Sequence, residues 1–382
     1  MTSEYWDNLQ SMREKYQVEL GLEKQGMDAF LYLRKLLEPH WANEAMSTHP
    51  MRSWLEVMGR GIDTVLIGLA KKLRALEGVE GFSPIIRRLA NPKEYASAEA
   101  EIETALRFLL AGFDVAFLKS TSEEPTPDIL VIRKEDRVLV EVTSVNPPEK
   151  EWRGMSLSGE IFRTLSDRMT VGGGFLCRLP SLREIEEFGR RLEVAREQSL
   201  ADNRVVKEYF PGLGLVFVAP KEKACELPSE YRGSFLLQTR TPKSKIEKIA
   251  QKVEKKGKRQ CSASEASMLV IYDRLLSPEE MGKILEDKRN DEVALGVDSF
   301  PGMLAAVLVM PWAWHSYECL PTENQMDSDR LYLFNKLPHD SKESVILWKN
   351  RHSNKRLTED IVTAFADYPR LVSALIAEPW RI

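Results

Sequence analysis

Two short runs of mostly β-branched residues form the clearest hydrophobic pattern in the chain, and a charged segment separates them. The runs cover residues 129–132 and 138–142, and residues 133–136 between them are all charged. β-Branched residues favour strands, and a short polar segment between two such runs is typical of a hairpin. The pattern therefore predicts two antiparallel strands joined by a tight turn.

Two acids flank this hairpin in a way that brings them together. A symmetric turn in the middle of the charged segment places Asp128 directly opposite Glu141, and opposed residues project from the same face of a sheet. Side chains alternate along a strand, so Glu141 shares its face with Thr143, whereas Val142 points to the other side. A shift of the register by one residue would turn Glu141 away from Asp128. The hairpin thus predicts a pair of carboxylates that can hold a divalent metal ion.

Apolar residues recur at helical spacing in the first 90 residues and again before the hairpin. Helices are expected in the first region at 4–20, 27–37 and 51–76. Basic and acidic residues are balanced there, which favours a packing or dimerisation surface. Another helix begins near Pro92, which suits a first helical turn, and ends before Gly112, a typical stop residue. A strand at 113–118 follows, so the order through the hairpin is helix, strand, strand, strand.

The chain beyond the hairpin is mixed in character until a second strongly patterned region begins. We interpret 147–232 as an insertion, with helices at 161–169 and 182–199, a strand at 213–219 and a flexible glycine turn at 172–174. Further strands are expected at 234–238, 267–272 and 303–310, with a closing helix at 358–376. Residues 243–260 form a basic helix with seven lysines and Arg259 against two glutamates. Its charged side is either a surface for phosphates or an ordinary solvated face.

Length and composition indicate a globular protein with two domains or one elaborated domain. Its 382 residues are 43% hydrophobic, and 58 acidic against 54 basic residues leave a net charge of −4. Any nucleic-acid surface must therefore be local. Four cysteines without ligand spacing argue against a zinc site or a disulfide framework. Neither a bilayer-spanning apolar run nor a signal peptide is recognisable, so a cytoplasmic location without a membrane partner is expected.

Taken together, these features resemble the PD-(D/E)XK, or restriction-endonuclease-like, nuclease superfamily, whose core order is helix, three strands, helix, strand. The resemblance covers residues 82–142 and 235–310. Glu101 in EIETALRFLLAGFDV matches the acid of the first core helix. Asp128 after a proline matches the motif aspartate, and Glu141 matches the acid of the third strand.

The basic helix and the strand SMLVIYD that follows it carry the rest of the resemblance. They are similar to the second core helix and the fourth strand of prokaryotic members, with Lys256 and Gln260 in the matching places. The resemblance implies that Lys252, Lys256 and Gln260 contact nucleic acid and that Lys256 neutralises the transition state. It also implies an α/β fold with a restriction-endonuclease-like core, a mixed central sheet flanked by helices, over residues 91–382. The helical region at 1–90 and the insertion would be added to that core.

The activity implied by the resemblance is that of a metal-dependent endonuclease, which hydrolyses phosphodiester bonds in DNA, in the setting of prokaryotic defence. Asp128, Glu141 and the backbone carbonyl of Val142 would hold Mg²⁺ or Mn²⁺. Glu101 would support a ligand water or a second metal ion. Nucleases of this kind often pair to cut two strands, so a homodimer is compatible with the resemblance, as is a partner protein.

Thr143 departs from the superfamily pattern, because it occupies the place of the motif lysine. In these nucleases the lysine is thought to help position the attacking water and to offset phosphate charge, and a hydroxyl group supplies no positive charge. Either Lys256, Lys252 or Lys119 supplies that charge, or the fold is retained without catalysis. The alternative function is a catalytically silent module that binds nucleic acid or a partner protein.

Each acid also has a structural explanation. Glu101 lies near an acid-rich helix start, which the helix dipole favours, and Asp128 after a proline is a common turn residue. Glu141 is harder to explain in this way, because an acid inside a buried strand is costly unless a cation or hydrogen bonds meet it.

Overall fold

The chain forms two compact units, of which one combines residues 1–146 with 242–382 and the other comprises 147–241. The second unit is inserted between β3 (Asp136–Ser144) and α10 (Pro242–Gln260), where the sequence predicts an insertion that ends at 232. The computed structural model describes residues 2–20, 24–41, 49–56, 60–119, 126–145, 169–176, 184–228, 235–237, 242–260, 265–273, 290–312, 325–326, 330–335 and 342–378.

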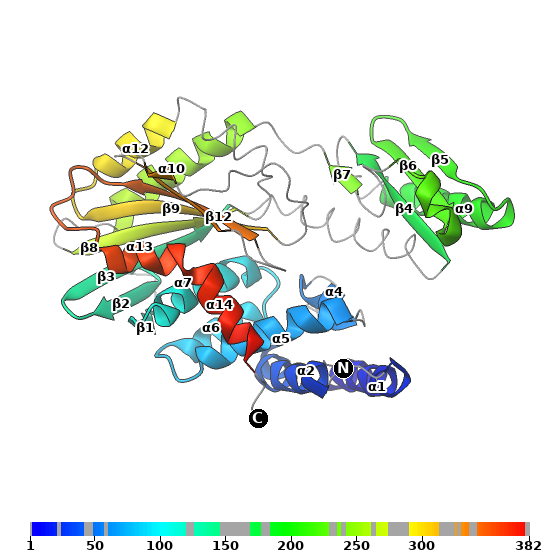
Figure 1. The fold of residues 1–382 in the computed structure, drawn as a ribbon, viewed down its shortest axis with the longest axis horizontal. Coiled ribbons are helices and arrows are strands. Elements are labelled where there is room, and N and C mark those ends of the chain that lie inside the picture. Colours follow the sequence, from blue (N-terminus) through cyan, green and yellow to red (C-terminus); the bar gives the residue numbers. More distant parts are fainter. Residues whose placement is uncertain are drawn as a thin grey trace. The chain divides into compact units, whose positions relative to one another are not determined.

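A mixed eight-stranded sheet lies at the centre of the first unit (Figure 1). In spatial order its strands are β1 (Asp114–Phe117), β2 (Ile129–Arg133), β3, β8 (Ala266–Tyr272), β9 (Met303–Trp312), β12 (Lys342–Lys349), β11 (Arg330–Asn335) and β10 (Gln325–Met326). β8 is parallel to both β3 and β9, whereas the other neighbouring pairs are antiparallel. The predicted α/β class with a mixed central sheet is confirmed.

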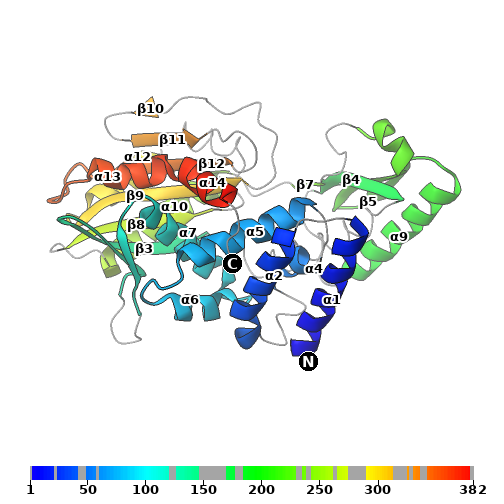
Figure 2. The ribbon, with the colours of Figure 1, turned by 60° about the horizontal axis from the view of Figure 1, so that its bottom comes forward.

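Helices cover both faces of this sheet (Figures 1 and 2). α7 (Tyr95–Leu110) and α13 (Glu359–Ala366) pack on one face, and α10 and α12 (Asn290–Asp298) pack on the other. Val140 and Val142 enter the core shared with α7. Because side chains alternate along a strand, Glu141 and Thr143 face α10.

The hairpin between β2 and β3 has the predicted register. Ile129 lies opposite Val140, and the pairing continues to a two-residue turn after Arg133. Just before β2, the Asp128 N–H donates to the Val140 carbonyl oxygen at 3.1 Å. The strand pairing therefore brings Asp128 beside Glu141.

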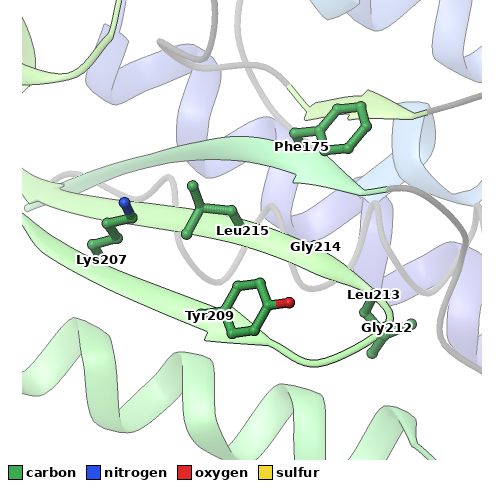
Figure 3. Close-up of a pocket in the computed structure, with 7 residues that line it drawn as sticks. All are labelled: Phe175, Lys207, Tyr209, Gly212, Leu213, Gly214 and Leu215. Atoms are coloured by element: carbon green, nitrogen blue, oxygen red, sulfur yellow. The ribbon is translucent and has the colours of Figure 1, made fainter.

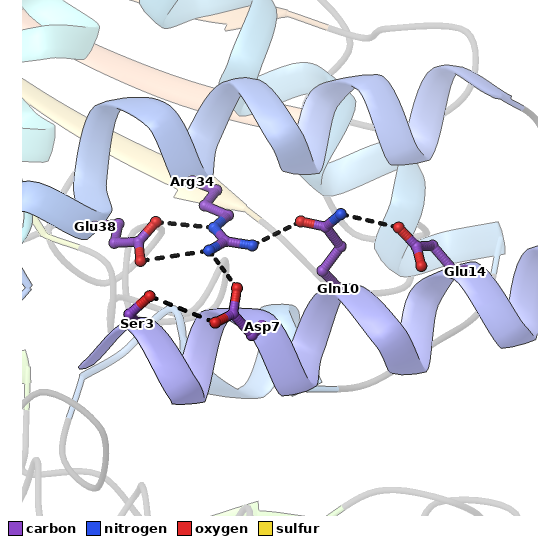
Figure 4. A network of polar contacts seen from close by, with 6 residues as sticks. All are labelled: Ser3, Asp7, Gln10, Glu14, Arg34 and Glu38. Carbon is purple, nitrogen blue, oxygen red and sulfur yellow. Dashed lines mark hydrogen bonds and ion pairs between the residues drawn. The ribbon is translucent and has the colours of Figure 1, made fainter. Parts of the chain in front are cut away.

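The amino-terminal helices share the core of the first unit. They are α1 (Thr2–Leu20), α2 (Lys24–Leu37), the short 3₁₀ helix η1 (Glu38–His40), α4 (Arg52–Glu56), α5 (Arg60–Ala75) and α6 (Phe82–Leu89). Trp6 and Phe30 lie in the same hydrophobic cluster as residues of α7 and the sheet. Arg34 ties α2 to α1 through Asp7 and Gln10, each at 2.6 Å (Figure 4). The described residues of the region at 1–90 are mainly helical, as predicted, but they share one core with the rest of the unit.

Two parts of the first unit differ from the sequence-based expectation. The closing helix is broken into α13 and α14 (Tyr368–Ala377), because Pro369 lies in the first turn of α14 and cannot continue a preceding helix. Helices α6 and α12 and strands β10, β11 and β12 have no predicted counterpart. Within the long helix expected at 51–76, α4 and α5 are present, and residues 57–59 between them lie outside the described residues.

The second unit contains a four-stranded sheet and one long helix. In spatial order the strands are β5 (Val206–Phe210), β6 (Gly214–Pro220), β4 (Thr170–Leu176) and β7 (Phe235–Leu237), with α9 (Ile185–Ala201) packed on them and η2 (Lys221–Glu226) after β6. The predicted glycine turn at 172–174 is wrong, since these residues are the middle of β4. A Cβ atom on Gly174 would lie 2.2 Å from the Leu215 carbonyl oxygen, so the close strand approach requires glycine. The helix predicted at 161–169 lies outside the described residues up to 168.

His49 is buried among the amino-terminal elements as a neutral ring. Its Nδ1 accepts the Met51 N–H at 3.1 Å, so the proton lies on Nε2, which donates to the Leu89 carbonyl oxygen at 2.9 Å. Trp41 and Tyr95 pack against the ring. Burial lowers the pKa of His49 to about 4, and the hydrogen bond to Leu89 only partly opposes this shift.

We expect His49 to make the protein less stable as the pH falls below about 6.5. The unfolded chain protonates this ring near its ordinary pKa, whereas the folded protein does so only near pH 4. Between about pH 7.5 and pH 5, the ring should lower the free energy of unfolding by ~2 kcal/mol. Urea unfolding at both pH values should contain this contribution, added to that of the other titrating groups, in wild type and in the exposed-site control His352→Gln. The loss should be smaller in His49→Gln, and equal pH dependence in all three proteins would contradict the assignment.

Candidate active site

Two carboxyl groups meet where β2 begins beside β3. Asp128 Oδ2 accepts the Val142 N–H at 2.8 Å, and the Asp128 carboxyl group lies close enough to that of Glu141 for the two to affect each other's ionisation. Glu141 is only 3% exposed, and Asp128 is partly buried. The pair of acids predicted from the hairpin is therefore present in a poorly solvated position.

The electrostatics of this pair favour an added cation. Burial raises the pKa of Asp128, because a carboxylate loses hydration when it leaves water. The Val142 N–H opposes this shift most strongly, followed by the positive charges of Lys256 and Arg88. A cation between Asp128 and Glu141 would offset the cost of keeping two poorly solvated carboxylates charged side by side.

Helix α10 delivers two lysines to the same face of the sheet. Lys252 and Lys256 are four residues apart and lie on one side of the helix. The Lys256 ammonium group forms an ion pair with Glu141, and Lys252 Nζ donates to Thr143 Oγ1 at 2.9 Å. Burial lowers the pKa of Lys252, and the positive charge of Lys256 adds to the shift. Thr143 thus has a lysine from another element against its hydroxyl group.

Glu101 adds a third acid from α7. It is 2% exposed, and Arg88 at the end of α6 binds both of its carboxylate oxygens, at 2.7 and 2.8 Å. Burial raises the pKa of Glu101 to about 7, and the neighbouring charge of Asp128 contributes to the rise. Arg88 limits this rise by stabilising the carboxylate. Glu101 is therefore an acid of the site and not a solvated residue of a helix start.

The other predicted site residues are distributed as follows. Val142 lies between Glu141 and Thr143 on β3, and its N–H is bound by Asp128 as described above. Lys119, one of the three candidates for the missing positive charge, is exposed after β1. Gln260 is the last residue of α10, and its side chain lies outside the described residues.

Arg88 is the member of the site that sequence reasoning did not find. Its position falls in α6, which was not predicted as a separate helix, and its partner Glu101 lies 13 residues further along the chain. The sequence signal that could have pointed to it is the pair Arg87 and Arg88 at the end of an amphipathic segment. In the structure, Arg87 is exposed and Arg88 is partly buried. The sequence pattern alone does not distinguish the two arginines.

The side chains around Asp128 and Glu141 can be matched to a divalent cation only in part. Within the described ranges, no group of three or more His, Cys, Asp or Glu side chains is close enough together to hold a metal ion. The carboxyl groups of Asp128 and Glu141 are nevertheless adjacent, and hard oxygen donors of this kind suit Mg²⁺ and Mn²⁺. Lys256 occupies one side of Glu141, so it would share that carboxylate with the cation. The residues fit the ion in chemical type.

An open hollow on the second unit has a different character (Figure 3). It is lined by Phe175 of β4, by Leu215 of β6, by Lys207 and Tyr209 of β5, and by the β5–β6 turn. No acid is among these residues. The hollow therefore does not contribute carboxylates to a metal site.

Comparisons with known proteins assign no family to the chain. No family model, no curated protein and no solved structure matches it.

In the part of the chain that the structure describes, no helix has both the length and the apolar character that crossing a membrane requires. Of the four cysteines, Cys225 is exposed and the other three lie outside the described residues.

Proposed function

We propose that this protein is a metal-dependent nuclease that hydrolyses phosphodiester bonds in DNA. The observation that carries the proposal is the meeting of Asp128 and Glu141 with two lysines of α10 on one face of the sheet. The order α7, β1, β2, β3, α10, β8 supports it as well, since a restriction-endonuclease-like core has the order helix, three strands, helix, strand. In this proposal the second unit is an insertion into that core.

Asp128, Glu141 and the Val142 carbonyl would hold Mg²⁺ or Mn²⁺. Such an ion, when bound, lowers the pKa of a water molecule and stabilises negative charge on the phosphate. Lys252 supplies the positive charge that Thr143 lacks, because its amine lies against the Thr143 hydroxyl group. Lys256 orients Glu141 and places a second positive charge where the phosphate would bind. Glu101 supports the acidic side of the site.

The preference for DNA, the role in prokaryotic defence and the cytoplasmic location are inferred from the resemblance alone. The same is true of a homodimer or a partner protein. The structural support for a polyanionic substrate is the charge of α10, where Lys248 and Lys255 act electrostatically on Lys252 together with Lys256. Clustered amines of this kind repel one another, and a phosphate backbone would relieve that repulsion.

The direct test is cleavage of single- and double-stranded DNA and RNA by the purified full chain with Mg²⁺, with Mn²⁺ or with EDTA. We expect DNA to be cut with either metal ion and to stay intact in EDTA. Cutting that continues in EDTA would contradict the metal-dependent chemistry. Cutting of RNA alone would mean that the substrate is RNA and not DNA. If a folded protein cuts none of the four substrates, the nuclease proposal fails.

The second candidate is a silent module with the same fold that binds nucleic acid or a partner protein. It is favoured by one observation, the threonine in the place of the motif lysine. In that case Lys252 and Lys256 would serve only to neutralise buried polar groups of the sheet. DNA binding measured by fluorescence anisotropy, without cleavage under any metal condition, would support this candidate.

A further inference from the structure

Arg88 and Glu101 form a contact that is more specific in its geometry than an ordinary surface ion pair. The guanidinium group binds the carboxylate in a two-pronged manner, at 2.7 and 2.8 Å. The Glu101 side chain is 3% exposed and that of Arg88 is 32% exposed, so the carboxylate is buried beneath its cation. The planar fork of arginine matches both oxygens at once, which a lysine ammonium group cannot do.

The contact joins two elements at the acidic side of the site. Arg88 comes from α6 and Glu101 from the first half of α7, and the charge of Arg88 also reaches Asp128. Glu94 lies 3.5 Å from Arg88 Nε and completes the surroundings of the guanidinium group. Without Arg88, Glu101 would lose its cation while remaining buried near Asp128. A carboxyl group in that position would take up a proton or turn away.

We propose that Arg88 is a positioning residue of the active site, which holds Glu101 as an oriented carboxylate beside Asp128 so that the two acids act together toward a divalent cation. This inference rests on the proposed function and adds to it a residue that sequence reasoning did not find. Arg88 acts through Glu101. The same fork that fixes the rotamer of Glu101 keeps its charge available to a metal-bound water or a second metal ion.

The experiment compares four full-length variants with wild type: Arg88→Met, Arg88→Lys, Glu101→Gln and the double variant Arg88→Met/Glu101→Gln. Arg87→Met is the matched control, because Arg87 is the exposed neighbour on the same helix. Two quantities are measured, the affinity for Mn²⁺ by electron paramagnetic resonance and the rate of DNA cleavage. Thermal unfolding identifies any variant that is not folded, and Arg88→Lys keeps the positive charge if Arg88→Met does not fold.

We expect Arg88→Met to weaken Mn²⁺ binding by about tenfold to a hundredfold, as is typical when the partner of a metal-site group is removed. Glu101→Gln should have a similar effect, and the double variant should be no worse than the worse single variant, since both changes break one unit. Arg88→Lys should recover only part of the affinity. Arg87→Met should match wild type.

The outcomes separate this inference from the proposed function. If wild type binds Mn²⁺ and cuts DNA while Arg88→Met equals Arg87→Met, only the positioning role is overturned. The role is also overturned if the effects of Arg88→Met and Glu101→Gln multiply in the double variant. If wild type neither binds Mn²⁺ nor cuts, the proposed function fails and the role of Arg88 toward a metal ion is overturned with it.

Discussion

Replacing Asp128 by asparagine or Glu141 by glutamine should lower the rate of metal-dependent DNA cleavage by about a thousandfold or more, which corresponds to ~4 kcal/mol of lost transition-state stabilisation. Both substitutions keep the size of the side chain and remove a negative charge. The amide oxygen of an asparagine at position 128 would still be able to accept the Val142 N–H, which Asp128 now accepts at 2.8 Å. The effect should therefore fall on chemistry and not on folding. Cleavage rates at saturating Mg²⁺ and the unfolding midpoint are the two measurements.

Asp114→Asn is a suitable control for the loss of one negative charge, because Asp114 is exposed at the start of β1 and lies opposite Ile132, at the turn end of the hairpin, whereas Asp128 lies at the other end. It should cut at the wild-type rate. Cleavage that persists in both Asp128→Asn and Glu141→Gln would show that the paired carboxyl groups are structural. If one variant loses activity together with a large fall in its unfolding midpoint, the other variant decides between chemistry and folding.

Replacing Lys252 by methionine should lower the cleavage rate by about a hundredfold, within the range expected for a positioned group that handles charge or protons at the reacting centre. Lys252 Nζ lies 2.9 Å from Thr143 Oγ1, so in the proposed function its positive charge replaces the one that Thr143 cannot supply. Adding Thr143→Lys to Lys252→Met should restore part of the activity, because the new amine would start from β3 and reach the same region. Thr143→Lys alone should not increase activity, since two amines would then crowd one site.

The control is Lys258→Met, because Lys258 is exposed on the same helix and pairs with Glu254. It should leave the cleavage rate unchanged if local position matters more than the total charge of α10. Equal losses in Lys252→Met and Lys258→Met would mean that the helix contributes only general attraction for phosphates. An unchanged rate in Lys252→Met would mean either that Lys256 supplies the positive charge or that cleavage does not need one at this position.

Local patterns in the sequence determined the most specific part of the site. The β2–β3 hairpin forms within a short stretch, and its pairing follows from alternation and a symmetric turn, so the opposition of Asp128 and Glu141 could be read from residue numbers. The basic character of α10 and the strand order up to β3 were predictable for the same reason. Each depends on neighbours a few residues away.

Contacts between segments that are distant in the sequence determined the other parts of the site and of the fold. Which lysine meets Thr143 depends on how α10 crosses β3, and these residues are 109 positions apart in the chain. Arg88 could not be distinguished from Arg87 until α6 packed against α7. The glycines of β4 have the composition of a turn, and only the close approach of β6 makes them a strand. A sequence pattern encodes which face of an element is buried, whereas packing decides which elements meet, because distant contacts are chosen by the shape and charge of the whole core.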